Sequence, residues 1–200
     1  MSVSLQDFKN QYSATRAFII GKGPSLDTIS DIESDLNTGA VFCLNESIHA
    51  IEKLNLNSPI YVVQQDSDLE YDCVPRNPST VHFMNSFQHT THKYQKKIVD
   101  VSPWNPRAVL YNPREIGETI CSLSAIVALK IAALMGVNSV TLCCFDALEN
   151  DFNGSAKYAD CIGMQKEGSH RSHNKIIVKS AHDLMQSVKT LKPHVASVEK

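Results

Sequence analysis

The amino-acid sequence predicts an α/β fold in which a mostly parallel sheet is flanked by helices, as a single domain over 1–200. Apolar runs of strand length alternate with longer segments of helical periodicity, the pattern expected of a parallel sheet covered on both faces. The 200 residues are 42% hydrophobic and 20% charged, which is typical of one globular domain rather than of a disordered chain.

The predicted strands are short apolar runs bounded by turn residues. They cover 16–20, 40–44, 59–63, 80–84, 108–111 and 139–145. The last run contains Cys143 and Cys144, whose side chains would point to opposite faces because side chains alternate along a strand.

The predicted helices lie between these strands and after the last of them. They cover about 25–36, a short stretch after Asn45, 118–135 and 173–191. The third is apolar on nearly every side and is followed by Gly136, a residue that favours a helix end. Two polar stretches, at about 85–113 and 147–172, are predicted as an irregular excursion and a loop.

Charge and cysteine usage exclude several classes of protein. The net charge of -2 argues against a dedicated duplex nucleic-acid binder, which carries a basic excess. The longest apolar stretch, 125–137, is interrupted by Lys130 and is too short to cross a bilayer, and the amino terminus has no signal-peptide pattern. The six cysteines form no Cys-x-x-Cys pair, so we expect reduced, buried thiols in a cytoplasmic protein.

Polar groups follow several of the predicted strands. They are the loop 21–25, Asn45, the segment 64–66 and Asp146. In parallel α/β sheets, ligands bind beyond the carboxyl ends of the strands. The sequence therefore predicts a ligand site where these groups converge.

The loop Gly21-Lys22-Gly23-Pro24-Ser25 comes directly after a strand and opens a helix. Glycines let the backbone approach a ligand closely, and N–H groups at a helix start hold phosphate. The loop lacks the third glycine of a dinucleotide-binding fingerprint and the Gly-Lys-Ser/Thr of a P-loop. An ordinary strand–helix turn remains the alternative interpretation.

Other polar residues are candidates for binding and catalysis. Asn45 has the chemistry to hydrogen-bond a base or ribose, or to cap a helix. Gln64 and Gln65 should point to opposite faces, so we expect only one of them at the ligand, together with Asp66. Ser124, near a helix start, fits a phosphate or sugar contact or plain packing between helices.

His173 is the predicted general base. It lies at the expected start of the last helix, where the helix dipole lowers an imidazole pKa and keeps the ring neutral at pH 7. His170 is the rival candidate, and a surface histidine is the alternative interpretation for both. No metal site is predicted, because His89 and His92 lack an obvious third ligand.

Five segments, in this order, resemble the bacterial lipooligosaccharide sialyltransferases, glycosyltransferase family 42. They are Phe-Ile-Ile-Gly-Lys-Gly-Pro-Ser-Leu at 18–26, Val-Phe-Cys-Leu-Asn at 41–45, Ser-Ala at 124–125 with the strand ending at Asp146, Asn-Gly-Ser-Ala-Lys-Tyr at 153–158, and Ser-His-Arg-Ser-His-Asn-Lys at 169–175. The first segment is also similar to a wider group that includes motility accessory factor glycosyltransferases and hydroxymethylpterin diphosphokinases of the MptE type.

The resemblance implies a Rossmann-like fold and metal-independent, inverting transfer of a sugar from a CMP-linked donor, with no further cofactor. His173 would deprotonate the acceptor hydroxyl, and Tyr158 would stabilise the leaving phosphate. Asn45 and Ser124 would contact the nucleotide, with the loop 21–25 lining its pocket. The family also tends to form homo-oligomers.

Three departures from the family pattern affect this site. Lys22 replaces an asparagine between the two glycines, Cys144 replaces a glycine before the strand-end aspartate, and Leu148 replaces a second tyrosine. The sequence thus predicts a sialyltransferase-like glycosyltransferase acting on a glycan acceptor. The alternatives are an MptE-like diphosphokinase using ATP and Mg²⁺, in which Asp66 and Asp146 would face the phosphates, and a non-catalytic nucleotide-binding protein on the same scaffold.

Overall fold

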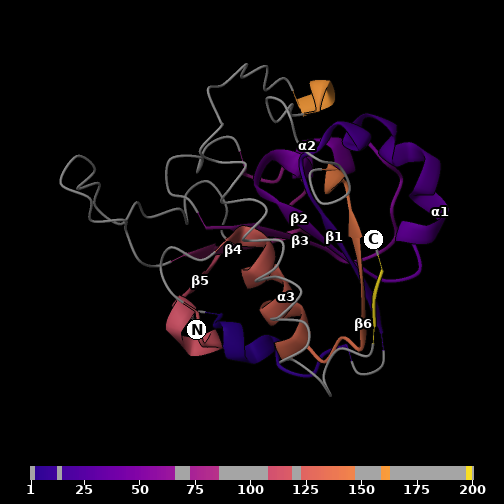
Figure 1. Ribbon diagram of the computed structural model, residues 1–200. Coiled ribbons are helices and arrows are strands. Elements are labelled where there is room, and N and C mark those ends of the chain that lie inside the picture. Colours follow the sequence, from indigo (N-terminus) through magenta and orange to yellow (C-terminus); the bar gives the residue numbers. More distant parts are fainter. Residues whose placement is uncertain are drawn as a thin grey trace.

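The computed structural model describes residues 3–12, 15–65, 73–85, 108–118, 123–146, 159–162 and 197–199. It contains one seven-stranded sheet in the order β5-β4-β3-β2-β1-β6-β7, and every neighbouring pair of strands is parallel. Helices lie on both faces of this sheet (Figure 1). The predicted α/β, Rossmann-like fold is therefore confirmed.

The strands match the sequence predictions closely. They are β1 (Arg16–Ile20), β2 (Ala40–Leu44), β3 (Ile60–Gln64), β4 (Val81–Asn85), β5 (Ala108–Tyr111), β6 (Ser139–Cys143) and β7 (Ser197–Glu199). β3 and β4 are shifted by one residue from their predicted bounds. β6 ends two residues earlier than predicted, because Cys144 has a left-handed backbone with a φ of 62°. β7 was not predicted.

The helical elements in predicted positions are shorter than predicted, and several elements are 3₁₀ helices. The short helices at Leu5–Phe8, Pro113–Ile116 and Asp160–Ile162 were not predicted. The helical elements are η1 (Leu5–Phe8), η2 (Pro24–Ile32), α1 (Glu33–Leu36), η3 (Asn45–Ser47), α2 (Ile48–Ile51), η5 (Pro113–Ile116), α3 (Ser124–Leu134) and η7 (Asp160–Ile162). The helix predicted from 25 is thus mainly the 3₁₀ helix η2, which kinks at Thr28. The helix predicted over 118–135 begins only at Ser124, although Gly136 follows it with the expected left-handed φ of 88°.

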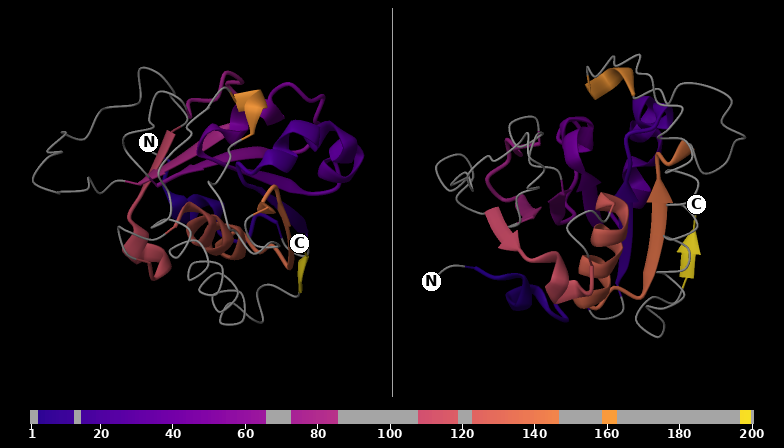
Figure 2. Two further views of the ribbon diagram at one scale, coloured as in Figure 1. Left: turned by 45° about the horizontal axis from the view of Figure 1, so that its top comes forward. Right: turned by 60° about the vertical axis from the view of Figure 1, so that its left-hand side comes forward.

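Two hydrophobic layers cover the sheet, because successive strand residues face opposite sides. On one face, α3 and η1 pack against alternate residues such as Ile19, Phe42 and Phe83. On the other, η2, α1 and α2 cover Phe18, Cys43 and their neighbours. Figure 2 shows α3 on the opposite side of the sheet from η2 and α1. The five cysteines within the described part of the chain are free thiols, of which Cys43, Cys73 and Cys143 are buried and Cys144 and Cys161 are half-buried.

The order of the strands reverses beside β1. The chain places β2 to β5 in turn on one side of β1, and then returns through α3 to place β6 on the other side. In open α/β sheets, the crevice at the carboxyl ends of such a strand pair is where ligands bind. Among the described residues, no helix is long and apolar enough to cross a membrane.

Candidate functional site

The loop Gly21–Ser25 lies at this reversal point, between the carboxyl ends of β1 and β6. The Gly21 amide donates to the Cys143 carbonyl at 2.8 Å, and the Gly23 amide donates to the Cys144 carbonyl at 3.0 Å. The loop is thus joined to the end of β6 through its backbone.

Both glycines are required by this close approach. A Cβ atom at Gly21 would lie 2.5 Å from the Cys144 carbonyl oxygen, which real Cβ atoms essentially never do. A Cβ at Gly23 would overlap the Asp146 carboxylate and come within 2.9 Å of the same carbonyl oxygen. The sequence suggested a phosphate loop from these glycines. In the structure, they allow the loop after β1 to pack closely against the end of β6.

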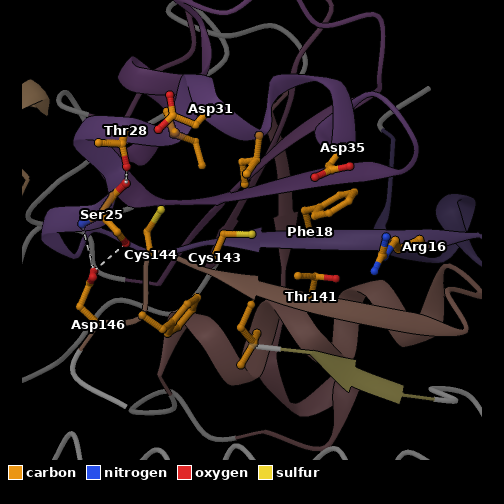
Figure 3. A pocket seen from close by; sticks show the side chains of 14 residues that line it. Arg16, Phe18, Ser25, Thr28, Asp31, Asp35, Thr141, Cys143, Cys144 and Asp146 are labelled. Carbon is orange, nitrogen blue, oxygen red and sulfur yellow. Dashed lines mark hydrogen bonds between the residues drawn. The ribbon is translucent and has the colours of Figure 1, made fainter. Parts of the chain in front are cut away.

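The Asp146 side chain is hydrogen-bonded to the first turn of η2. Its Oδ2 atom accepts hydrogen bonds from the Ser25 amide at 3.2 Å and from the Ser25 hydroxyl at 2.9 Å (Figure 3). Pro24 has no N–H, and the amides of Gly21 and Gly23 are bonded as described above. In this conformation a carboxylate from the chain itself occupies the anion position at the helix start that the sequence suggested for phosphate.

Lys22 pairs with Glu46 instead of pointing into an open anion site. The Lys22 ammonium lies 2.7 Å from Glu46 Oε2, and the two side chains are 16% and 2% exposed. Glu46 follows Asn45 at the end of β2, so the ion pair holds that turn against the glycine loop. Sequence reasoning missed Glu46, because an acidic residue after a strand has no local pattern that reveals its partner 24 positions away.

Asn45 directly follows β2 with a left-handed φ of 51°. It is the first residue of η3 and not its cap, so the helix-cap alternative is wrong: Leu44 is the N-cap, and no side-chain cap bond is made. The Asn45 side chain is buried, and its Oδ1 atom has no hydrogen-bond partner within the described part of the chain. Buried acceptors are normally satisfied, so this oxygen is a candidate ligand contact.

Gln64 and Gln65 are both buried at the carboxyl end of β3. The Tyr111 hydroxyl donates to Gln65 Oε1 at 2.5 Å, and Tyr111 belongs to the core on the α3 face. Gln64 continues the alternation of β3 on the opposite face, which agrees with the expectation that the two side chains diverge. Gln65 therefore has a structural hydrogen bond in addition to its predicted role.

Ser124 is the first residue of α3, and no side-chain cap bond is made at that end. Since α3 leads down into β6, its amino terminus lies at the carboxyl edge of the sheet (Figure 1). The uncapped N–H groups and the helix dipole favour an anion there. The structure thus places Ser124 at the same edge of the sheet as Asn45 and the loop.

A groove of about 580 Å³ opens beside this edge, on the face that η2 and α1 cover. It extends from Ser25 and Asp146, past Cys143, to Arg16 and Thr141 (Figure 3). Asp31 and Asp35 lie on its helical wall, so the described lining is rich in carboxylates.

Both cysteines at the end of β6 line this groove, which corrects the expectation that they face opposite sides. The left-handed turn at Cys144 brings its side chain to the same side as that of Cys143. Burial raises the pKa of Cys143 to about 11 and that of Cys144 to about 12. Both are therefore protonated thiols at neutral pH, with little nucleophilic character.

Four predicted site residues, Asp66, Tyr158, His170 and His173, lie outside the described residues. So do Leu148, Cys121, the helix predicted over 173–191 and most of the two polar stretches. Among the described residues, no group of three or more His, Cys, Asp or Glu side chains is arranged to hold a metal ion.

Comparison with protein-family models and with curated proteins finds no match to the chain.

Proposed function

We propose that this protein is a sialyltransferase-like glycosyltransferase, which transfers a sugar from a CMP-linked donor to a hydroxyl group of a glycan acceptor. The acceptor oxygen attacks the anomeric carbon, the bond from that carbon to the phosphate oxygen breaks, and CMP leaves. The proton of the acceptor hydroxyl passes to His173. The roles of His173 and Tyr158 rest on the sequence resemblance.

The observation that carries the proposal is the state of Asn45. A buried acceptor without a partner among the described residues is costly, and such costs concentrate at functional sites. Asn45 lies next to the reversal point of the sheet, where α/β folds bind nucleotides. A base amino group or a ribose hydroxyl would satisfy its Oδ1 atom.

The structure also suggests where the phosphate would bind. Asp146 already occupies the start of η2, whereas the start of α3 at Ser124 has no side-chain cap. We therefore assign the nucleotide phosphate to the amino terminus of α3 rather than to the glycine loop.

A nucleotide screen with a matched pair of variants tests this proposal. The melting temperature of the wild-type protein should rise with CMP or CDP in the absence of metal, and Asn45→Ala should lose most of this rise. Asn10→Ala is the control, because Asn10 has a similar left-handed φ of 59° and its backbone amide binds the Leu134 carbonyl at the last residue of α3, opposite the helix end at Ser124. Absence of a melting shift with any of CMP, CDP, UDP and ATP would reject the proposal and favour a non-catalytic protein.

One observation favours a second candidate, Mg²⁺-dependent phosphoryl transfer from ATP. The Ser25 hydroxyl and the Asp146 carboxylate meet at 2.9 Å at a strand–loop–helix junction. A hydroxyl and a strand-end aspartate are the groups that hold Mg²⁺ in P-loop nucleotide hydrolases. Stabilisation by ATP only when Mg²⁺ is present would replace the glycosyltransferase proposal with this one.

A further inference from the structure

Glu46 has an unusual environment for a carboxylate. We propose that Glu46, held in place by Lys22, recognises a pair of neighbouring hydroxyl groups on the bound nucleotide ligand. This inference rests on the proposed function and adds to it a residue and a ligand chemistry that the sequence resemblance did not supply.

The two oxygen atoms of Glu46 differ in their contacts. Oε2 lies 2.7 Å from the Lys22 ammonium, whereas Oε1 is buried and has no hydrogen-bond partner among the residues that the structure describes. The preceding residue, Asn45, also carries a buried side-chain oxygen without a partner. Two adjacent residues on one turn therefore each present an unsatisfied acceptor.

The chemistry of these atoms limits what can satisfy them. An ionised carboxylate accepts hydrogen bonds but cannot donate, and an amide oxygen likewise only accepts. The ligand must therefore supply donors. An ionised phosphate oxygen accepts hydrogen bonds and offers no donor, so it satisfies neither atom. A cation has little to gain because Lys22 already balances the carboxylate charge.

Neutral hydroxyl groups meet both conditions, and neighbouring hydroxyls on a sugar ring supply two donors together. A hydrogen bond from a hydroxyl to a charged acceptor is worth more than one to a neutral acceptor, and a desolvated site strengthens it further. Leaving such an acceptor unsatisfied in a buried site has a corresponding cost. The site should therefore discriminate strongly for the hydroxyl groups.

The position of the Asn45–Glu46 turn fits the sugar part of a nucleotide. β2 is the direct neighbour of β1, so this turn begins about one strand spacing, ~4.8 Å, from the glycine loop. Lys22 is the more exposed member of the ion pair and has a long, flexible side chain. The Lys22 side chain can therefore adjust as the ligand enters while its ammonium stays on Glu46 Oε2, which leaves Oε1 for a sugar hydroxyl.

Two parts of a CMP-linked donor carry neighbouring hydroxyls: the ribose and the transferred sugar. Calorimetric titration of the wild-type protein with CMP, 2′-deoxy-CMP and a CMP-linked sugar separates them. If the ribose is recognised, 2′-deoxy-CMP should bind roughly 10- to 100-fold more weakly than CMP. If the screen described above selects another base, the same comparison uses that ribonucleotide and its deoxy form.

The variant Glu46→Gln tests the residue itself. It should weaken CMP binding roughly ten-fold and reduce the preference for ribose over deoxyribose. Glu52→Gln is the matched control: Glu52 also has one bonded oxygen, which accepts from the Asn77 amide at 2.8 Å, and one buried oxygen without a partner, but it lies at the far end of α2. This control should bind CMP as the wild-type protein does.

The outcomes test the role of Glu46 separately from the proposed glycosyltransferase function. A ribose preference that Glu46→Gln reduces supports the inference, and a loss confined to the CMP-linked sugar supports it with the transferred sugar as the source of the hydroxyls. Equal binding of CMP and 2′-deoxy-CMP, with no effect of Glu46→Gln on any of the three ligands, overturns the inference and leaves the proposed function intact. No binding of any nucleotide to the wild-type protein overturns both.

Discussion

Single residues at the ends of the strands determine the shape of the candidate site. Asn45 and Cys144 directly follow β2 and β6, and both have left-handed backbones. Asparagine tolerates this conformation, whereas cysteine is strained by its Cβ atom. A glycine at the position of Cys144 would have no such strain.

Glycine and alanine substitutions at Cys144 should therefore differ in stability in the opposite direction from most positions. In most positions alanine is better than glycine, but at this left-handed position Cys144→Gly should be more stable than Cys144→Ala by about 1 kcal/mol. Urea unfolding of both variants measures the difference. The same two substitutions at Cys143, inside β6, are the control and should show the normal order. Greater stability of Cys144→Ala would contradict the strain argument.

At the scale of elements, the first helix after β1 differs most from its prediction. The helix was predicted from an apolar stripe at Leu26, Ile29, Ile32 and Leu36. The structure buries these side chains except that of Ile32, which is partly buried. The stripe did not reveal that the segment is largely 3₁₀ helix, because that depends on the junction at Pro24, the kink at Thr28 and the contact with β6. Hydrophobic periodicity identifies the buried side of a helix better than its hydrogen-bond pattern.

Asp27 joins this helix to η7, more than 130 residues later. Its carboxylate accepts from the Cys161 amide at 2.8 Å and from the Asp160 amide at 3.2 Å. The hydrogen bonds from Cys161 are the main cause that lowers the pKa of Asp27 below its usual 3.8. The ionised carboxylate thus holds η7 against η2.

Asp27→Asn should weaken this junction and speed hydrogen exchange at the amides of Asp160 and Cys161. In the wild-type protein, the protection factor of these two amides compares their exchange rate with that of an unfolded chain at the same pH. This factor should be at its full value above about pH 4 and should decrease as the pH falls through the lowered pKa of Asp27. Asp31→Asn, in the same helix, is the control and should leave both amides protected. Unchanged exchange in Asp27→Asn would show that other contacts hold η7.

At the scale of the whole molecule, stability depends on an uncharged histidine in the sheet. His82 lies in β4 with no exposed surface, and neither ring nitrogen has a hydrogen-bond partner among the described residues. Burial lowers its pKa to about 4. The unfolded chain therefore binds a proton at a higher pH than the folded protein does, so folding stability should fall as the pH drops below about 6.5.

The expected contribution of His82 is a loss of about 2 kcal/mol in the free energy of unfolding between pH 7 and pH 5. His82→Leu should remove this loss and cost little at pH 7, because the ring gives up no hydrogen bond. Urea unfolding at both pH values measures the effect, with His49→Leu as a control that should keep the pH dependence. If His82→Leu lost the same free energy of unfolding between pH 7 and pH 5 as the wild-type protein, the pH dependence would come from other groups.

The sequence predicted the sheet better than the site. Strands buried on both faces are continuous apolar runs, so β1, β2 and β5 were predicted with their observed bounds. The positions of the loop 21–25, Asn45 and Asp146 at the carboxyl edge followed from the fold class alone. The Lys22–Glu46 pair and the Asp146–Ser25 bonds could not be predicted, because they join residues that only the completed sheet brings together.

The place of β6 in the sheet has a consequence for the order of events during synthesis. β1 is synthesised early, but β6, which pairs with it, leaves the ribosome only after more than a hundred further residues. The hydrogen bonds from Ser25 to Asp146 span 121 positions. Until then the glycine loop lacks the carbonyls and the carboxylate that hold it. The nascent chain therefore remains unable to assemble this pocket until translation has passed Asp146, and contacts of such long range are slow to form.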